Sequence, residues 1–303
     1  MMGKKLTNFT SWQNLKFFLY ANFKLFMRLF NLRIFDKQLT EYFMHLVLDA
    51  MKYRSEHNIS RPDMINILME AKGLAKSDNS KSHNREWSDI DIVAQCFLFF
   101  FAGFETSSVL MCFAAHELLE NPEVQAKLLQ EIEDVSQQLA GKPLTYEALQ
   151  GMRYMDMVIS EVLRKWPPAV AIDRMCNKDI VYEVDGLRVA IREDECVWLP
   201  LSGLHRDPKY FPNPEKFDPE RFSEENKNNI QPFTYLPFGM GPRNCIGSRF
   251  ALLEAKAMIF YMVRDFVLQA GKNTTIPMKL APKGFTLAPE KGFWLKLCPR
   301  AVI

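Results

Sequence analysis

The amino-acid sequence predicts a mainly α-helical protein with small β-sheets, and two observations lead to that class. Apolar residues recur with the period of an α-helix over most of residues 12–166 and again over 248–266. Between these stretches, short runs rich in Val, Ile and Leu are bounded by turn signals, as is typical of strands. We find no internal repeat, so a solenoid or a propeller is not indicated.

The first part of the chain divides into helices at residues that start or stop them. We expect helices over 12–31 and 36–57, followed by a short helix over 62–72 that has Pro62 in its first turn. Residues 73–89 are rich in Ser, Asn, Asp and Lys and therefore predict a loop.

A long apolar helix is expected over 88–120, and Pro122 then opens the next helix, which runs to residue 139. Thr145 has the residue type of an N-cap and predicts a short helix after it. A further helix over 154–166 ends at the Pro-Pro pair that follows.

Strands are expected over residues 170–201, where short apolar runs bounded by turn signals replace the helical period. Asp185-Gly186 is a hairpin turn signal between two of them. Residues 205–247 are rich in Pro, Gly and Asn and predict little regular structure before the helix over 248–266. The expected strands are 170–176, 180–184, 187–191 and 196–201.

Composition excludes some functions and leaves others open. The net charge is only +2 and no basic stripe with interleaved aromatics occurs, so we expect no nucleic-acid partner. The 24 Phe and 16 Met suit a wide apolar pocket, although a large core has the same composition. The six cysteines form no C-x-x-C pair, so neither a zinc site nor a disulfide framework is predicted. Free cysteines indicate a reducing compartment.

Residues 1–35 carry basic and aromatic side chains and no acid. Such a segment is consistent with an amphipathic helix in a membrane interface, with a mitochondrial targeting peptide, or with a core helix that has a solvated cationic edge. The longest apolar run, 96–104, is much shorter than the roughly 20 residues of a bilayer span. We therefore expect contact with a membrane surface rather than a transmembrane helix.

A glycine-rich segment around Cys245 has features that would hold a thiolate. Residues 238–247 read Phe-Gly-Met-Gly-Pro-Arg-Asn-Cys-Ile-Gly and lead directly into a helix. The helix N-terminus and nearby backbone N–H groups stabilise an anionic sulfur, and the glycines let the backbone approach a flat partner. By residue type alone, a structural cysteine in a turn fits the segment as well.

This segment resembles the cytochrome P450 haem-binding loop, F-x-x-G-x-R-x-C-x-G, at every fixed position: Phe238, Gly241, Arg243, Cys245 and Gly247. The resemblance implies haem b with Cys245 as its axial thiolate, and Arg243 and Arg174 on the haem propionates. It also implies cofactor contacts for Phe238, Gly239, Gly247 and Ala102.

A second pattern is the pair Glu161 and Arg164, which share one face of a helix at a spacing of three residues. An ordinary surface ion pair has the same spacing. The sequence is similar to the P450 E-x-x-R helix and its later Pro-rich segment, here Asp218-Pro-Glu-Arg221. The resemblance implies that Glu161, Arg164 and Arg221 form a buried structural triad that braces the haem loop.

The third pattern, Ala102-Gly-Phe-Glu105-Thr106, lies within the long helix over 88–120. Gly103 weakens the helix, and a threonine that hydrogen-bonds backward can open it. The segment is similar to the P450 oxygen-activation motif, which implies that Thr106 and Glu105 relay protons. Their presence favours monooxygenation over the peroxide-rearranging members of the family. Without the resemblance, a kink with polar residues explains the segment equally well.

The resemblance implies a single cytochrome P450 domain over 1–303, of the animal microsomal type found in insects and truncated at its N-terminus, with 1–35 as a membrane-facing amphipathic region. The expected function is oxygen insertion from O2 into a lipophilic substrate, with electrons from NADPH through cytochrome P450 reductase, at the cytoplasmic face of the endoplasmic reticulum membrane. The alternative is a catalytically dead fragment that acts as a binding partner. Expected pocket residues are Phe101, Phe104, Val170, Ile172 and Phe285.

Overall fold

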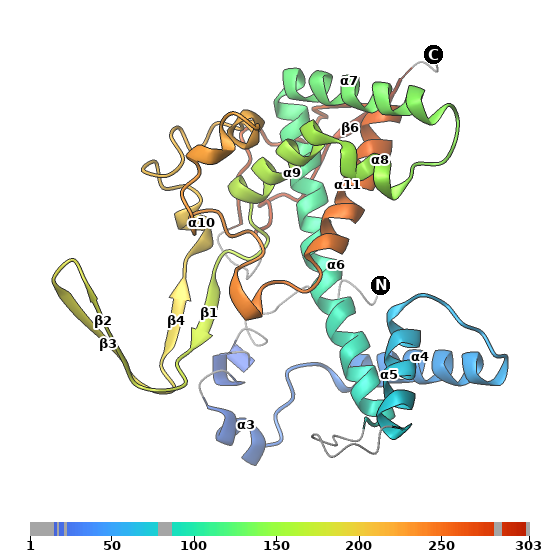
Figure 1. The fold of residues 1–303 in the computed structure, drawn as a ribbon, viewed down its shortest axis with the longest axis vertical. Coiled ribbons are helices and arrows are strands. Elements are labelled where there is room, and N and C mark those ends of the chain that lie inside the picture. Colours follow the sequence, from blue (N-terminus) through green and yellow to red (C-terminus); the bar gives the residue numbers. More distant parts are fainter. Residues whose placement is uncertain (1–14, 17, 21–22, 78–86, 282–286, 301–303) are drawn as a thin grey trace. The chain divides into compact units, whose positions relative to one another are not determined.

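The protein is described by a computed structural model that covers residues 15–16, 18–20, 23–77, 87–281 and 287–300. The chain forms two compact units, residues 1–105 and 106–303. Its described part consists mostly of helices, with three small antiparallel sheets of two strands each (Figure 1). The fold class predicted from the sequence is therefore confirmed.

The first unit contains α3 (Lys24–Leu29), α4 (Lys37–Glu56), α5 (Met64–Ser77) and the first half of α6 (Asp89–Glu120). α4 begins where Asp36 caps it, because the carboxylate accepts a 2.8 Å hydrogen bond from the Gln38 N–H. Arg54 near the end of α4 donates two hydrogen bonds, of 2.6 and 2.7 Å, to Asp63 just before α5. This bidentate pair fixes the connection between the two helices.

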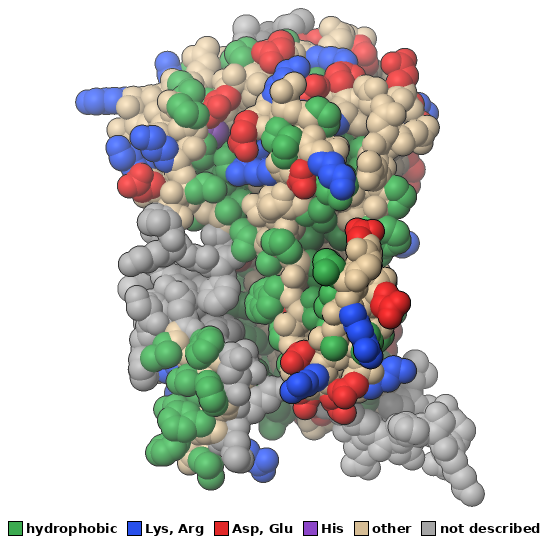
Figure 2. All heavy atoms as spheres, turned by 90° about the vertical axis from the view of Figure 1, so that its left-hand side faces the viewer, with side chains coloured by type: hydrophobic (Ala, Val, Ile, Leu, Met, Phe, Trp, Pro, Cys, Tyr) green, Lys and Arg blue, Asp and Glu red, His purple; other side chains and the backbone are tan. Residues whose placement is uncertain are grey.

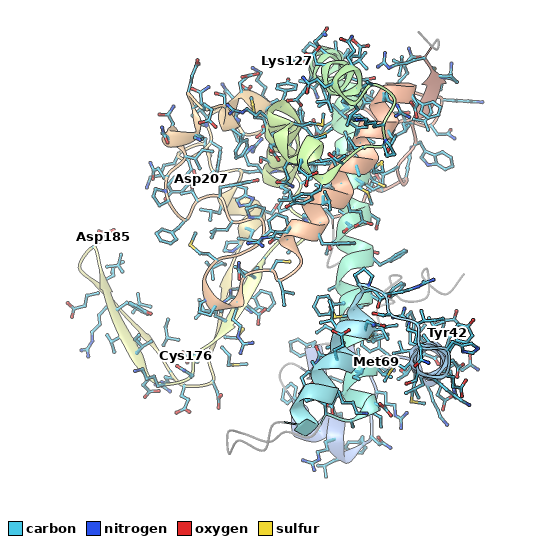
Figure 3. The ribbon with its side chains drawn as sticks, turned by 45° about the vertical axis from the view of Figure 1, so that its right-hand side comes forward. Tyr42, Met69, Lys127, Cys176, Asp185 and Asp207 are labelled. Atoms are coloured by element: carbon cyan, nitrogen blue, oxygen red, sulfur yellow. The ribbon has the colours of Figure 1, made fainter. Side chains whose placement is uncertain are left out.

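Two apolar clusters hold the first unit together. Val47 and Met51 of α4 pack on Ile92 and Val93 of α6, with Met69 of α5 against them. Figure 3 labels Met69 on α5 and Tyr42 on α4. The second cluster is aromatic and joins residues before α4, on α4 and on α6: Phe35, Leu39, Phe43, Phe97 and Phe101.

The extent of α5 differs from the sequence prediction of a helix over 62–72 and a loop over 73–89. The helix begins at Met64, two residues after Pro62, because Asp63 accepts a hydrogen bond from the Asn66 N–H and so occupies the helix start. It continues through Gly73 to Ser77. A glycine inside a helix costs only about 1 kcal/mol relative to alanine, and the good helix formers on both sides of Gly73 outweigh that cost.

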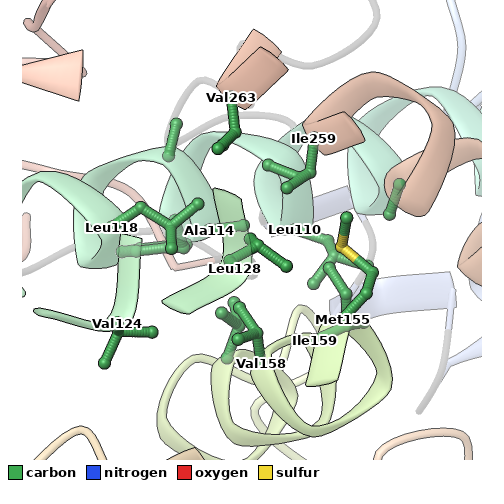
Figure 4. Packing of buried hydrophobic residues seen from close by; sticks show 14 of the residues in the cluster. Leu110, Ala114, Leu118, Val124, Leu128, Met155, Val158, Ile159, Ile259 and Val263 are labelled. Carbon is green, nitrogen blue, oxygen red and sulfur yellow. The ribbon is translucent and has the colours of Figure 1, made fainter. Parts of the chain in front are cut away.

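The second unit is built on four helices: the second half of α6, α7 (Pro122–Leu139), α9 (Arg153–Lys165) and α11 (Ser248–Asp265). The short α8 (Tyr146–Gly151) precedes α9, and the Thr145 hydroxyl caps it by accepting a 3.2 Å hydrogen bond from the Ala148 N–H. Figure 4 shows how these helices fill one core with aliphatic side chains. The residues labelled there are Leu110, Ala114, Leu118, Val124, Leu128, Met155, Val158, Ile159, Ile259 and Val263.

Two of the sheets lie where the sequence predicts strands. β1 (Ile172–Met175) pairs with β4 (Cys196–Leu199), and β2 (Ile180–Val184) pairs with β3 (Leu187–Ile191). Asp185 and Gly186 both have positive φ, 50° and 75°, as a two-residue hairpin turn requires. Figure 3 shows Asp185 at the tip of this hairpin and Cys176 near its base.

The third sheet joins β5 (Phe266–Gln269) to β6 (Lys296–Pro299) near the end of the chain. Gln125 of α7 fastens β5 to the core, because its buried amide both accepts from the Leu268 N–H at 2.9 Å and donates to the Leu268 carbonyl at 3.1 Å. Between β4 and α11, regular structure is limited to short helical turns: α10 (Leu201–Leu204), η1 (Pro219–Phe222), η2 (Lys227–Asn229) and η3 (Gly241–Arg243).

Among the described residues, α6 is long and apolar enough to cross a membrane when judged by length and composition. Core helices meet the same criteria. The second half of α6 is such a helix, because Phe113 and Leu118 are buried in the core of the second unit. Glu117 is buried there too and is paired with Lys165 at 2.8 Å and with the Trp166 indole at 2.6 Å. On the face shown in Figure 2, acidic and basic side chains are interspersed.

The packing of the second unit predicts a large effect of Leu128→Ala. Leu128 is fully buried between helices, so truncation removes apolar contacts and leaves a cavity. We expect urea unfolding of the 303-residue chain to show a loss of about 2–5 kcal/mol. Leu187→Ala is the matched control, because Leu187 is 69% exposed in the hairpin. Equal effects of the two substitutions would contradict the described core.

Candidate functional site

Cys245 lies in a tight loop directly before α11, and its side chain is exposed. The loop is closed by a 2.8 Å hydrogen bond from the Cys245 N–H to the Phe238 carbonyl. Gly239 and Gly241 have φ of +69° and +79°, a conformation that side chains with a Cβ rarely adopt. The geometry thus presents one thiol to solvent three residues before the first residue of a long helix, whose N-terminus favours an anion.

The loop lies against β1. A Cβ placed on Gly239 would stand 3.8 Å from the Ile172 Cδ1 atom and 4.0 Å from the Arg174 Nη2 atom. The structure therefore brings Arg174 and Ile172 to the glycine turn that holds Cys245. Arg174 is half-buried and donates to the Asp173 carbonyl at 2.7 Å. Arg243, within the loop itself, is exposed and forms no ion pair with any described residue.

These residues fit the haem that the sequence motif implies. A porphyrin supplies four nitrogen ligands, so the protein needs to add only a single axial atom, and the exposed Cys245 sulfur is a suitable one. Two guanidinium groups, of Arg174 and Arg243, are available for carboxylates such as propionates. Ile246, which follows Cys245, and Phe250, in the first turn of α11, are 85% and 68% exposed, which suits contact with an apolar macrocycle.

Glu161, Arg164 and Arg221 meet in one buried cluster. Arg164 donates to both carboxylate oxygens of Glu161, at 2.7 and 2.8 Å, and both side chains are 0% exposed. The Arg221 guanidinium lies 3.4 Å from the same carboxylate. Burial raises the pKa of the Glu161 carboxyl, and the hydrogen bonds and charge of Arg164 act against that rise.

The cluster also gathers the backbone of the Pro-rich segment. Arg164 donates to the carbonyls of His205 at 2.9 Å and Pro214 at 2.8 Å, and the Asp218 N–H donates to Glu161 at 2.9 Å. Arg221 donates to the Asn213 carbonyl at 3.0 Å. Arg164 and Glu161 of α9 thus form hydrogen bonds with backbone groups of a segment that has no regular ladder of its own.

Sequence reasoning missed the role of His205. The imidazole is fully buried, and its Nε2 atom accepts a 2.9 Å hydrogen bond from the Leu236 N–H, two residues before Phe238. Burial, and next the nearby Arg164 charge, lower the pKa of His205 to about 4. The sequence offered one signal, a histidine inside a Pro-rich segment. Residue spacing alone could not identify the Leu236 N–H as the group that it binds.

The residues of the predicted oxygen-activation motif lie on α6. The sequence suggested that Gly103 and Thr106 open the helix locally. In the structure the helix continues without a break through residues 102–106. A Cβ on Gly103 would meet no atom within 4 Å, so there is open space beside the helix. Ala102 is exposed, whereas Glu105 and Thr106 are half-buried; Glu105 ends the first unit and Thr106 begins the second.

The expected pocket residues fall in three places. Phe101 packs in the aromatic cluster of the first unit, 5.5 Å from the Phe35 ring centre, and Phe104 stacks on Phe100 at 5.7 Å. Val170 and Ile172 are half-buried beside and within β1. Phe285 lies outside the described residues.

The buried cluster predicts that Arg164→Leu is strongly destabilising. The change leaves the Glu161 carboxylate buried without its partner and removes the donor to two carbonyls. We expect a loss of about 3–5 kcal/mol in the free energy of unfolding, measured by urea denaturation. Arg264→Leu is the control, since Arg264 pairs with Asp265 at the surface and should contribute less than about 1 kcal/mol. A loss in Arg164→Leu no larger than in the control would contradict the role of the cluster.

The pKa of His205 predicts how stability depends on pH. Because the folded-state pKa of about 4 lies below the unfolded value of 6.5, the unfolded chain binds more protons between these limits. The contribution to stability is therefore complete above pH 6.5 and is lost as the pH falls toward 4. Between pH 7 and 4.5, we expect wild type to lose about 2 kcal/mol more of its unfolding free energy than His205→Gln. Parallel pH profiles of the two proteins would refute this assignment.

The chain is similar to known proteins over nearly its whole length. The cytochrome P450 family matches residues 1–296. A protein described as probable cytochrome P450 9f2 of Drosophila melanogaster is 60% identical over 300 residues, which cover 99% of this chain and 58% of the relative. Cytochrome P450 9e2 of Blattella germanica is 46% identical over 303 residues, with 98% and 56% covered. Cytochrome P450 3A31 of Mesocricetus auratus is 41% identical over 274 residues, with 90% and 52% covered.

The chain thus spans a little more than half the length of the relatives it matches. The matched region includes the Cys245 loop, the Glu161–Arg164 pair and the α6 motif. With a family match over nearly its whole length, this chain belongs to the cytochrome P450 family.

Proposed function

We propose that this protein is a haem-thiolate monooxygenase that inserts one oxygen atom of O2 into a lipophilic substrate. The observation that carries the proposal is the exposed Cys245 thiol on a glycine turn before α11. The overall reaction consumes the substrate, O2, two electrons and two protons, and it yields the hydroxylated product and water.

Cys245 would supply the sulfur ligand of the haem in this proposal. Its loop leads directly into α11, and the 2.8 Å hydrogen bond from the Cys245 N–H to the Phe238 carbonyl fixes the backbone that carries the sulfur. Haem b, when bound, supplies the reductive cleavage of O2, which a thiolate ligand favours.

Arg243 and Arg174 orient the cofactor by pairing with its propionates. Arg174 lies within 4.0 Å of the position where a Cβ of Gly239 would stand, so a charge is available at the edge of the loop. Phe238, Gly239, Gly247 and Ala102 complete the proposed cofactor contacts. Phe238 also packs against the buried core, which gives the loop a rigid base.

Glu105 and Thr106 are assigned the delivery of protons. A carboxyl group and a hydroxyl group in adjacent positions can pass a proton from solvent to a site inside the protein. Both are half-buried, and Gly103, two residues before Glu105, has open space where a side chain would stand. Phe101, Phe104, Val170 and Ile172 are the proposed apolar contacts of the substrate, and Phe285 is a further one. Such side chains bind lipophilic molecules through burial of apolar surface.

The proposed partners are NADPH-cytochrome P450 reductase as the electron donor and a membrane surface, which places the protein at the cytoplasmic face of the endoplasmic reticulum membrane. Support for the membrane comes from α3 and its flanks, where Phe23, Phe26, Leu29 and Phe30 are all exposed. The basic Arg28 lies among them. Exposed aromatic and cationic side chains on one short segment suit a lipid headgroup region.

The test of the proposal is Cys245→Ala. We expect wild type to bind haem and to give, when reduced under carbon monoxide, the absorption typical of a thiolate ligand, and the variant to lose that signal. Cys196→Ala is the control, because Cys196 is also an exposed free thiol. A thiolate spectrum that survives in Cys245→Ala would reject the assignment. A chain that binds no haem would favour the alternative of a non-catalytic binding partner.

A further inference from the structure

A buried histidine connects the ion-pair cluster to the thiol loop. The His205 carbonyl accepts the hydrogen bond of Arg164, and the His205 ring accepts the N–H of Leu236. Leu236 is buried, and it lies two residues before Phe238, whose carbonyl binds the Cys245 N–H. A continuous path of hydrogen bonds and short chain segments therefore runs from α9 to Cys245.

The surroundings of the ring leave it little freedom. The ring centres of Tyr235 and Phe211 lie 5.5 and 6.4 Å from that of His205, on a ring with no exposed surface. The backbone of Arg164 and Leu163 also lies within reach of the ring. The bond to Leu236 is the hydrogen bond with good geometry that the imidazole makes among the described residues.

We propose that His205 is a positioning residue for the thiol: its Nε2 atom fixes the Leu236 N–H and thereby sets where the 238–247 loop presents Cys245. The proposal rests on the proposed function only in treating the Cys245 sulfur as the haem ligand. The contact itself does not depend on it.

The chemistry requires a neutral ring in one tautomer. Nε2 can accept from an N–H donor only when it carries no proton, so the ring proton resides on Nδ1. A protonated ring would place one N–H donor against another and would break the contact.

Substitutions separate this role from simple packing, because the bond from Arg164 goes to the His205 backbone and survives any change of side chain. His205→Gln places an amide oxygen close to the position of Nε2 and keeps the acceptor. His205→Phe keeps a ring of similar shape and removes the acceptor. Tyr235→Phe is the matched control, because it removes the 3.0 Å bond from the Tyr235 hydroxyl to the Ser160 carbonyl, a different tether of the same segment.

The first measurement is hydrogen–deuterium exchange of the 303-residue chain without haem. In His205→Phe we expect exchange at Leu236 and across 238–247 to be about tenfold faster, because one buried hydrogen bond is lost, while α9 and α11 keep their wild-type protection. His205→Gln and Tyr235→Phe should match wild type over 238–247. Unchanged exchange in His205→Phe overturns the proposal. Faster exchange throughout α9 and α11 also overturns it, because the ring would then be only a packing element.

The second measurement is a haem titration of the same variants, followed by the spectrum of the reduced carbon monoxide complex. We expect His205→Phe to hold haem more weakly and to lose part of the thiolate signal, and His205→Gln to keep both. Identical titrations of wild type and His205→Phe would contradict the proposal. If wild type itself binds no haem, the proposed function fails, whereas the exchange experiment still decides the role of His205.

Discussion

Glu161 and Arg164 have both lost their hydration water in the folded state, and neither charge could be buried alone. Two hydrogen bonds between them recover part of the lost solvation, and the remaining donors of Arg164 go to backbone carbonyls rather than to other side chains. The pair is therefore satisfied only when a distant part of the chain folds around it. The ion pair therefore fixes the backbone of the segment that follows β4.

That segment has little secondary structure of its own, because proline lacks an N–H donor and both Pro and Gly disfavour helices. Its backbone groups instead bind the side chains of Arg164, Glu161 and Arg221. The carbonyl of His205 is bound in the same way, and its ring holds the next part of the segment. The order of the thiol loop thus derives from α9, a helix that is itself fixed in the four-helix core.

Much of this fold could be predicted from local signals in the sequence. Pro122, Thr145 and the Asp185-Gly186 turn each define a boundary by their own backbone chemistry, and the structure places elements there. The sequence prediction of the end of α5 was wrong, because Gly73 and the polar residues after it indicated a loop, whereas the good helix formers on both sides of Gly73 carry the helix to Ser77. Spacing could pair Glu161 with Arg164, but their contact with Arg221 spans 60 residues and was expected only from the family resemblance.

The position of Cys245 outside a helix has a physical reason. Within α11 the sulfur would be tied to helical geometry, and the N–H of the cysteine would be used inside the helix. In the loop, the N–H closes the turn onto Phe238, and positive φ at Gly239 allows the backbone to lie against Ile172 and Arg174. A Cβ at Gly239 would meet ordinary van der Waals contacts there, so the strain of a substitution would come from φ rather than from crowding. The conformation of the turn, more than its tight packing, is thus what requires glycine beside the thiol.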